Sequence, residues 1–148
     1  MKAKRTNHTD PHFAALNAMM DDWYYAKYGE IALEFHKHNR LDNLTAVVIM
    51  YDMDKPVACG AYRHHDDESV EIKRMFVLQV YRRRGVAKQL LRHLEDIARE
   101  NGYVRSVLQT GAVMDAAIAL YSAMGYEQTP KYGAFKEEEN VVCMAKTL

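Results

Sequence analysis

A basic turn between an apolar segment and a helix is the part of the sequence best suited to chemistry. The apolar segment covers residues 75–81, and Arg82, Arg83, Arg84 and Gly85 follow it directly before an amphipathic run. Backbone N–H groups in the first turn of a helix have no intrahelical partner, and they lie at the positive end of the helix dipole. Gly85 lets the backbone approach a ligand closely. We therefore expect this turn to bind a polyanion, with a solvated basic helix start as the alternative.

The overall composition is that of one ordinary globular domain. The chain has 148 residues, of which 49% are hydrophobic and 27% charged, so a single domain spanning residues 1–148 can bury a core. Twenty Lys and Arg residues balance twenty Asp and Glu residues, so neither a nucleic acid nor a membrane surface is expected as a partner. The longest apolar runs are too short to span a membrane, and the basic N-terminus lacks the apolar part of a signal peptide. We expect a cytoplasmic protein.

Periodicity predicts that helices come first and strands follow. Asp10 and Pro11 form a helix start signal, and apolar residues then recur at helical spacing. A second helical stretch is expected from about Trp23 to His36. Gly60, inside an expected strand, indicates a bulge or a close approach of the backbone. β-branched and apolar residues predict strands at Thr45–Tyr51, Val57–Arg63 and 70–79.

The second half of the chain alternates helices and strands. A long helix is expected from about Arg84 to Asn101, where an Asn-Gly pair ends it. It is followed by a strand at Val104–Thr110, a helix at Met114–Met124, and extended segments at 126–129 and 141–146. This order predicts a single α/β domain in which helices flank a sheet.

Two motifs in this half resemble the GNAT family of N-acetyltransferases. Arg82-x-x-Gly85-x-Ala87 matches the family's Q/R-x-x-G-x-G/A signature, and residues 116–126 resemble its A-x-x-L-Y-x-x-x-G-F/Y motif. The resemblance covers about residues 13–148. Shorter segments that resemble a bacterial branch of small acetyltransferases are Gly29-Glu30, Asn39-x-Leu41-Asp42, 71–77 and Tyr132-Gly133.

The resemblance implies a fold and a co-substrate. The fold is a mixed, mostly antiparallel sheet of about six or seven strands flanked by about four helices. The co-substrate is acetyl-CoA, and no metal is implied. Backbone groups at the end of the third strand would line the pantetheine arm, and the basic turn would hold the pyrophosphate. The residues implied to contact acetyl-CoA are Met75, Phe76, Val77, Arg82, Arg83, Arg84, Gly85, Val86, Ala87 and Lys88.

Tyr121 and Glu71 are the candidates for proton transfer, because acetylating an amine requires a neutral nucleophile and a proton for the departing thiolate. By the same resemblance, Tyr121 is the acid, since the matching tyrosine lies near the CoA sulfur. Packing on a helix face is its alternative. Glu71 is the candidate base because its position matches the strand glutamate of histone-type members. Even offsets place Glu71 on the same strand face as Val77 and Lys73, and a surface ion pair with Lys73 is the alternative.

The residues that contact the acceptor are also inferred from the resemblance. The family regions that contain Tyr28 and Tyr132 form the acceptor pocket, and we expect both to contact the substrate. Lys73 shares the strand face of Glu71 and either pairs with it or helps to bind an acidic substrate, and we expect Gln109 to orient a water or the substrate. Gln109 stands where N-terminal protein acetyltransferases carry a glutamate, and Met114 replaces a family asparagine. Both departures argue against a protein N-terminus as the acceptor.

Histidine and cysteine patterns predict neither a metal site nor a disulfide. His36-x-His38 and His64-His65 lack further residues at ligand spacing. Cys59 and Cys143 are far apart in the sequence, and we expect both to be buried strand thiols.

The function expected from these features is acetyl transfer from acetyl-CoA to a primary amine of a small molecule, by direct attack in a ternary complex. A protein lysine acetyltransferase and a non-catalytic acyl-CoA sensor are the alternatives. A nucleic-acid binder built on Arg82–Arg84 is disfavoured because the chain has no net positive charge. The resemblance also suggests a homodimer, since dimers are common among the proteins it covers.

Overall fold

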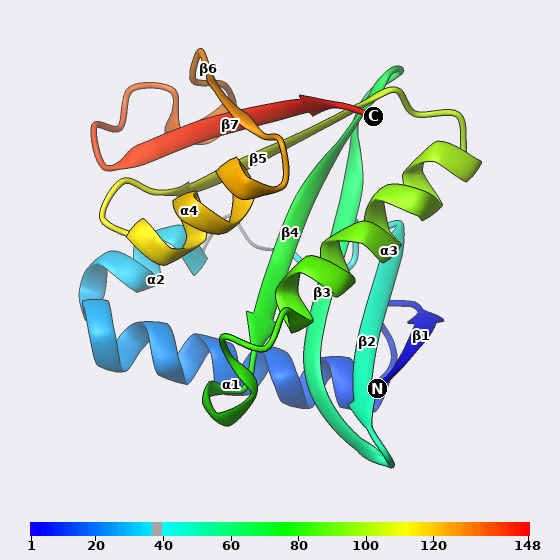
Figure 1. Cartoon of the computed structure of the whole chain (residues 1–148). Coiled ribbons are helices and arrows are strands. Elements are labelled where there is room, and N and C mark those ends of the chain that lie inside the picture. Colours follow the sequence, from blue (N-terminus) through cyan, green and yellow to red (C-terminus); the bar gives the residue numbers. More distant parts are fainter. Residues whose placement is uncertain (37–39) are drawn as a thin grey trace.

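A seven-stranded sheet organises the chain in the computed structural model, which describes residues 1–36 and 40–148 (Figure 1). The strand order is β1-β2-β3-β4-β5-β7-β6, and all neighbours run antiparallel except β4 and β5, which are parallel. The predicted mixed, mostly antiparallel sheet is confirmed. Its strands are β1 (Lys2–Thr6), β2 (Ala46–Asp52), β3 (Lys55–Asp66), β4 (Ser69–Val77), β5 (Arg105–Gly111), β6 (Glu127–Thr129) and β7 (Val141–Thr147).

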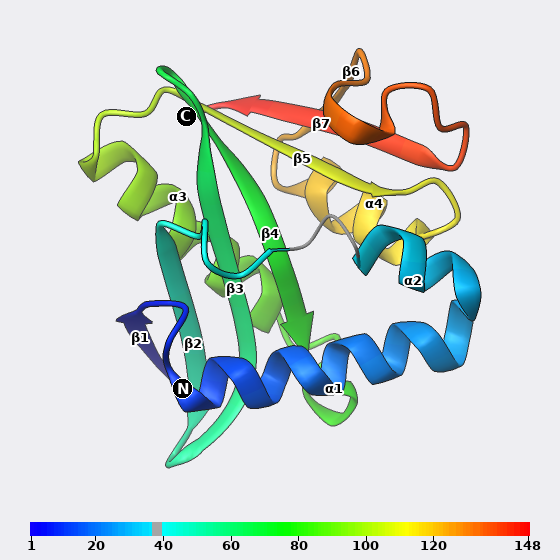
Figure 2. The ribbon, with the colours of Figure 1, turned by 180° about the vertical axis from the view of Figure 1, so that it is seen from behind.

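Helices cover both faces of this sheet (Figure 1 and Figure 2). Phe13, Leu16 and Met20 of α1 pack against one face of β2 and β3, whereas apolar residues of α3 and α4 form a second core with the other face. Two short 3-10 turns, at Gln79–Tyr81 and Gly133–Phe135, lie in the connections. The α-helices of the described chain are α1 (Pro11–Tyr28), α2 (Glu30–His36), α3 (Val86–Glu100) and α4 (Asp115–Ala123).

The break between the first two helices lies at Gly29, so the boundary predicted near Trp23 is wrong. Gly29 has a φ of 63°, and its N–H donates to the Tyr25 carbonyl at 2.8 Å. A positive φ favours glycine, which ends the helix here. The structure therefore keeps Trp23, Tyr24 and Tyr28 on one continuous helix.

Strand β1 has no apolar pattern in the sequence and was not predicted, because its residues are almost all charged or polar. Lys2 pairs with Tyr51 and Thr6 with Val47 in antiparallel register along β2. Charged side chains are common on edge strands, where they discourage pairing with other chains. An ion pair of 2.6 Å between Arg5 and Glu100 also connects this edge to α3.

A β-bulge in β4 overturns the prediction that Glu71 and Val77 share a face. Two residues, Arg74 and Met75, stand opposite Gly60, and Arg74 has a φ of 58°. The extra residue reverses the alternation along the rest of the strand. Val77 therefore belongs to the core beneath α3, and Glu71 lies on the opposite face from its buried neighbour Ile72.

At Gly60 the backbone of β3 lies close to neighbouring side chains, as the sequence predicted. A Cβ atom at this position would lie 2.5 Å from Met75 Sδ and 3.0 Å from Leu94 Cδ1. The bulge and α3 thus pack directly against the backbone of β3. A larger residue at Gly60 would push Met75 out of its place.

Candidate active site

A groove of about 1290 Å³ runs from α1 and α2, across β4 and β5, to the start of α3 and to α4. It opens where the parallel pair diverges: β4 and β5 pair only over Ser69–Glu71 and Arg105–Val107, and the two strands then separate (Figure 1). Unpaired strand edges can bind an extended ligand through backbone hydrogen bonds. Met75, Phe76 and Val77 all line this part of the groove.

The basic turn and the first turn of α3 close one end of the groove. Arg83 and Gly85 have φ angles of 63° and 77°, and this tight path turns the backbone into α3. Gly85 has no side chain to cap the helix, so the first N–H groups of α3 are available to a ligand. The groove is lined here by Arg82, Arg83, Gly85, Val86, Ala87 and Lys88.

Two arginines of the turn are held by aromatic rings. The Arg82 guanidinium lies 4.4 Å from the centre of the Trp23 ring, and its Nε donates to the Val77 carbonyl at 2.9 Å. Arg82 therefore connects the turn to α1. Arg84 lies over the Tyr81 ring at 5.3 Å and does not line the groove, unlike the other residues expected to contact acetyl-CoA.

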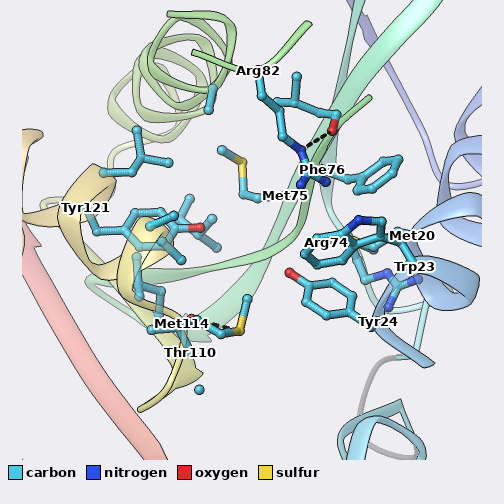
Figure 3. A pocket seen from close by; sticks show the side chains of 18 of the residues that line it. Met20, Trp23, Tyr24, Arg74, Met75, Phe76, Arg82, Thr110, Met114 and Tyr121 are labelled. Carbon is cyan, nitrogen blue, oxygen red and sulfur yellow. Dashed lines mark hydrogen bonds between the residues drawn. The ribbon is translucent and has the colours of Figure 1, made fainter. Parts of the chain in front are cut away.

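Tyr121 lines the groove from α4. Its ring packs edge-on against Tyr126, with ring centres 5.7 Å apart. Within the described residues the Tyr121 hydroxyl has no hydrogen-bond partner, and burial together with the nearby Tyr24 hydroxyl raises its pKa above the ordinary value. Figure 3 shows the Tyr121 and Tyr24 oxygens directed into the same space. The Tyr121 hydroxyl is therefore protonated and free to donate.

Glu71 is fully buried among cations and does not line the groove. Its Oε1 accepts a hydrogen bond from Arg63 Nε at 2.6 Å, and its Oε2 accepts one from the Tyr132 hydroxyl at 2.6 Å. Lys73 Nζ lies 3.9 Å from Oε1. The ion pair with Lys73, expected as the alternative, is therefore present, but it is buried and not at the surface. The role of Glu71 as a base stays a prediction.

Three of the four residues expected to contact the acceptor line the groove: Lys73, Gln109 and Tyr28. Tyr132 lies behind them. Its hydroxyl donates to Glu71, and its carbonyl accepts a hydrogen bond from Gln109 Nε2 at 2.6 Å. Tyr132 therefore supports the wall of the groove through other side chains.

Arg74 and Trp23 belong to the site but were missed in the sequence analysis. Arg74 is buried; it donates to Asp21 at 2.8 Å and also hydrogen-bonds Asn17, so α1 is fixed to the bulge of β4. The available signal for Arg74 was that it follows Lys73 directly, so that two cations in succession break the alternation of charged and apolar residues that begins at Val70. Trp23 had none beyond its place in a helical pattern.

Histidines and cysteines have ordinary structural partners. Across residues 1–36 and 40–148, no three His, Cys, Asp or Glu side chains gather as metal ligands. His64 bonds the Tyr103 hydroxyl at 2.8 Å, and His65 packs on Tyr132. Of the earlier pair His36-x-His38, the second histidine lies outside the described residues, as does Asn39. Both cysteines are buried, and burial raises the pKa of Cys59 to about 12.

The groove has the shape expected for an acyl-CoA, a long ligand with phosphates at one end. Open strand edges lie along its length, and a helix start rich in cations lies at its end. This arrangement defines the class of coenzyme-A-dependent acyltransferases. Residues 13–126 match the Acetyltransferase (GNAT) family, so the chain belongs to this family. None of the described helices is both long and apolar enough to cross a bilayer.

Individual relatives agree with this assignment. The uncharacterised N-acetyltransferase YsnE of Bacillus subtilis is 34% identical over 100 residues, which are 66% of either chain. The chain spans less than half the length of several vertebrate relatives that it matches. A candidate acyl-CoA N-acyltransferase from Klebsiella pneumoniae superposes with a TM-score of 0.81 at 25% identity, covering 99% of this chain and 97% of that one. A GNAT acetyltransferase from Elizabethkingia anophelis with acetyl-CoA bound has the same fold, with a TM-score of 0.73 at 17% identity over 99% of this chain and 97% of its own.

Proposed function

We propose that this protein is an acetyl-CoA-dependent N-acetyltransferase that acetylates a primary amine of a small molecule by direct attack in a ternary complex. The observation that carries the proposal is the Tyr121 hydroxyl. It has no partner among the described residues and faces the groove that begins at the α3 N-terminus. Family membership supports acetyl-CoA as the acyl donor.

The cofactor end of the groove fits the phosphates and the pantetheine arm of acetyl-CoA. N–H groups from Val86 to Lys88 and the Arg83 side chain would hold the pyrophosphate. Strand edges at Met75–Val77 would pair with the amides of the pantetheine arm. These contacts use mainly backbone groups, so they depend on the path of the turn more than on its side chains.

Tyr121 supplies the proton that the reaction requires. The amine nitrogen forms a bond to the acyl carbon, the carbon–sulfur bond breaks, and the departing thiolate takes the Tyr121 proton. An ordinary thiol has a pKa of about 8.5, and burial raises the pKa of Tyr121 above that of a free phenol, so the proton transfer is uphill and is completed when solvent reprotonates Tyr121. The amine must lose one proton before it attacks, because an alkylammonium with a pKa of about 10.4 has no lone pair. Its nitrogen gives up a second proton once the bond to carbon has formed, and solvent in the groove carries these protons away and reprotonates Tyr121.

The enclosed acceptor end favours a small molecule. The Lys73 side chain is only 13% exposed although it lines the groove, and Gln109 is held against the loop before β7. Tyr24 and Tyr28 of α1 stack with ring centres 6.0 Å apart on the opposite wall. An acceptor that reaches Lys73 must therefore enter between α1 and β4.

The experiment is free-thiol release from acetyl-CoA against a panel of primary amines, with each acetylated product identified by mass. Wild type and Tyr121→Phe are assayed side by side, and acetyl-CoA binding is measured for both. We expect release with one class of amine and its loss in Tyr121→Phe. Binding of acetyl-CoA without release for any amine would contradict the proposal, and release only with a peptide lysine would reassign the acceptor to proteins.

A further inference from the structure

Lys73 is a cation in the groove whose charge is not fully matched. Its side chain is 13% exposed, and it comes from β4 immediately before the bulge. Within the described part of the chain its ammonium has no hydrogen bond; its nearest acidic atom is Glu71 Oε1 at 3.9 Å. The ammonium is therefore open to the groove, where a ligand atom can supply a hydrogen-bond acceptor.

Glu71 is only a partial partner, because its nearest oxygen lies 3.9 Å from the ammonium, beyond hydrogen-bond distance. Arg63 Nε already donates a hydrogen bond to Glu71 Oε1 at 2.6 Å, and the Tyr132 hydroxyl donates one to Glu71 Oε2 at 2.6 Å. Two cations, Arg63 and Lys73, therefore share one carboxylate. The next cation, Arg74, is paired with Asp21 at 2.8 Å. Among these three described cations, Lys73 is the one whose charged group makes no hydrogen bond to a carboxylate.

The electrostatics around Lys73 favour an added anion. Burial lowers the pKa of Lys73, and the charges of Arg63 and Arg74 lower it further, while Glu71 opposes them. A carboxylate placed against the ammonium would stabilise its charged form and supply the missing hydrogen-bond acceptor.

The position of Lys73 also limits the length of the ligand. Met75, which lines the part of the groove assigned to the pantetheine arm, is two residues further along β4. Two fully extended residues span at most about 7 Å, and the bulge at Arg74 lies between Lys73 and Met75. A carboxylate bound at Lys73 and an amine at the acyl carbon must then belong to one short molecule.

We propose that Lys73 binds a carboxylate of the acceptor, so that the substrate is a short amino carboxylate such as an amino acid. This inference rests on the proposed function and narrows its substrate class. Lys73 is a binding residue here, and the chemistry remains with Tyr121.

The test compares amino acids with the amines that lack only their carboxylate, for example phenylalanine with phenethylamine and lysine with cadaverine. Wild type should have the lower KM for each carboxylated member. Lys73→Met keeps the length of the side chain but removes its charge. We expect it to raise KM for the amino acids by about 10- to 100-fold, with little change for the decarboxylated amines.

Two further variants separate this role from general damage. Lys73→Arg keeps the charge and should keep the preference for carboxylated amines. Lys88→Met removes another groove lysine at the cofactor end, and should raise KM for acetyl-CoA without changing the ratio between the paired amines. Thermal unfolding and acetyl-CoA affinity are measured for every variant, so that a misfolded protein is recognised.

A binding measurement keeps the inference independent of turnover. The N-acetyl amino acid product should bind wild type by calorimetry in the presence of CoA and should bind Lys73→Met at least about 10-fold more weakly. Equal KM values for carboxylated and decarboxylated amines in wild type would overturn the inference and leave the proposed function standing. Binding of the product without acetylation of any amine would instead support Lys73 as the carboxylate-binding residue and overturn the proposed function.

Discussion

The cofactor end of the groove comes from one continuous stretch, Met75 to Lys88, whereas the acceptor end is assembled from α1, α2, β4, β5 and the loop before β7. At the cofactor end the useful groups are backbone amides placed by a tight turn. At the acceptor end they are buried side chains, with Glu71 accepting from Arg63 of β3 and Tyr132 of the loop. Backbone conformation therefore controls one end, and charge balance controls the other.

Gly85→Glu should have the largest effect, because it acts on the backbone of the cofactor end. The φ of 77° strains any side chain, and the added carboxylate would lie where we place the pyrophosphate. We expect the acetyl-CoA Kd to rise at least about 100-fold by calorimetry. Gly102→Glu is the matched control, since Gly102 has a φ of 86° at the other end of α3. Equal acetyl-CoA affinity in both variants would remove the phosphate site from this turn.

Tyr121→Phe tests the chemistry between the two ends. Loss of the proton donor should lower kcat about 100-fold and leave the acetyl-CoA Kd within about 2-fold. Tyr24→Phe removes the facing hydroxyl from α1 and should change acceptor KM more than kcat. Since burial raises the pKa of Tyr121, its proton should not be lost as the pH rises to about 10 in a rate profile. Equal losses of kcat in the two variants would show that Tyr121 has no special role.

Glu71→Gln tests how the acceptor end uses its charge. Two roles are open to Glu71: a base, as its strand position predicts, or the counter-ion of Arg63 and Lys73. Its hydrogen bonds favour the second. We expect the free energy of unfolding to fall by about 3 kcal/mol in urea, because two cations lose their buried partner, and the rise of rate with pH to persist.

Tyr132→Phe is the matched control for loss of the Glu71 charge. It removes one hydrogen bond to Glu71 but keeps the carboxylate, so it should cost about 1–2 kcal/mol of unfolding free energy. A flattened pH–rate profile in Glu71→Gln, with stability unchanged, would instead make Glu71 the base.

Arg83→Gly should have the smallest effect and separates backbone from side chain within the turn. Relief of the left-handed φ of 63° gains about 1–2 kcal/mol, and the flexibility of glycine in the unfolded chain offsets about 0.5–1 kcal/mol of this. Thermal unfolding should show a net gain of about 0.5 kcal/mol, while the acetyl-CoA Kd rises only a few-fold. Met53→Gly, at a φ of 55° in the exposed β2–β3 turn, should gain similarly with an unchanged Kd. A large rise of Kd in Arg83→Gly would mean that this side chain dominates phosphate binding.

Local patterns predicted the cofactor end well. The strand, the turn and α3 are consecutive in the chain, and apolar periodicity with the Gly-containing signature placed them within a few residues. The acceptor end was less predictable. Arg63, Glu71 and Tyr132 come from three separate segments, and no local pattern states that their side chains meet.

The bulge in β4 shows most directly where prediction from the sequence fails. Regular alternation of side chains along a strand predicted that Glu71 and Val77 lie on the same face. One extra residue at Arg74 reverses the alternation, so the two side chains lie on opposite faces. That residue is stabilised by contacts outside the strand: Asn17 and Asp21 hold the Arg74 side chain, and Gly60 leaves room for Met75. A strand pattern contains none of this information.

The sequence by itself determined the order of helices and strands after β1, the position of the basic turn before α3 and the family of the chain, because these depend on short-range periodicity and motif spacing. Only the tertiary structure decided which charges are matched. Glu71 accepts hydrogen bonds from Arg63 and Tyr132, whereas Lys73 lines the groove. The physical reason is that burial and ion pairing depend on distances between segments that are far apart in the chain.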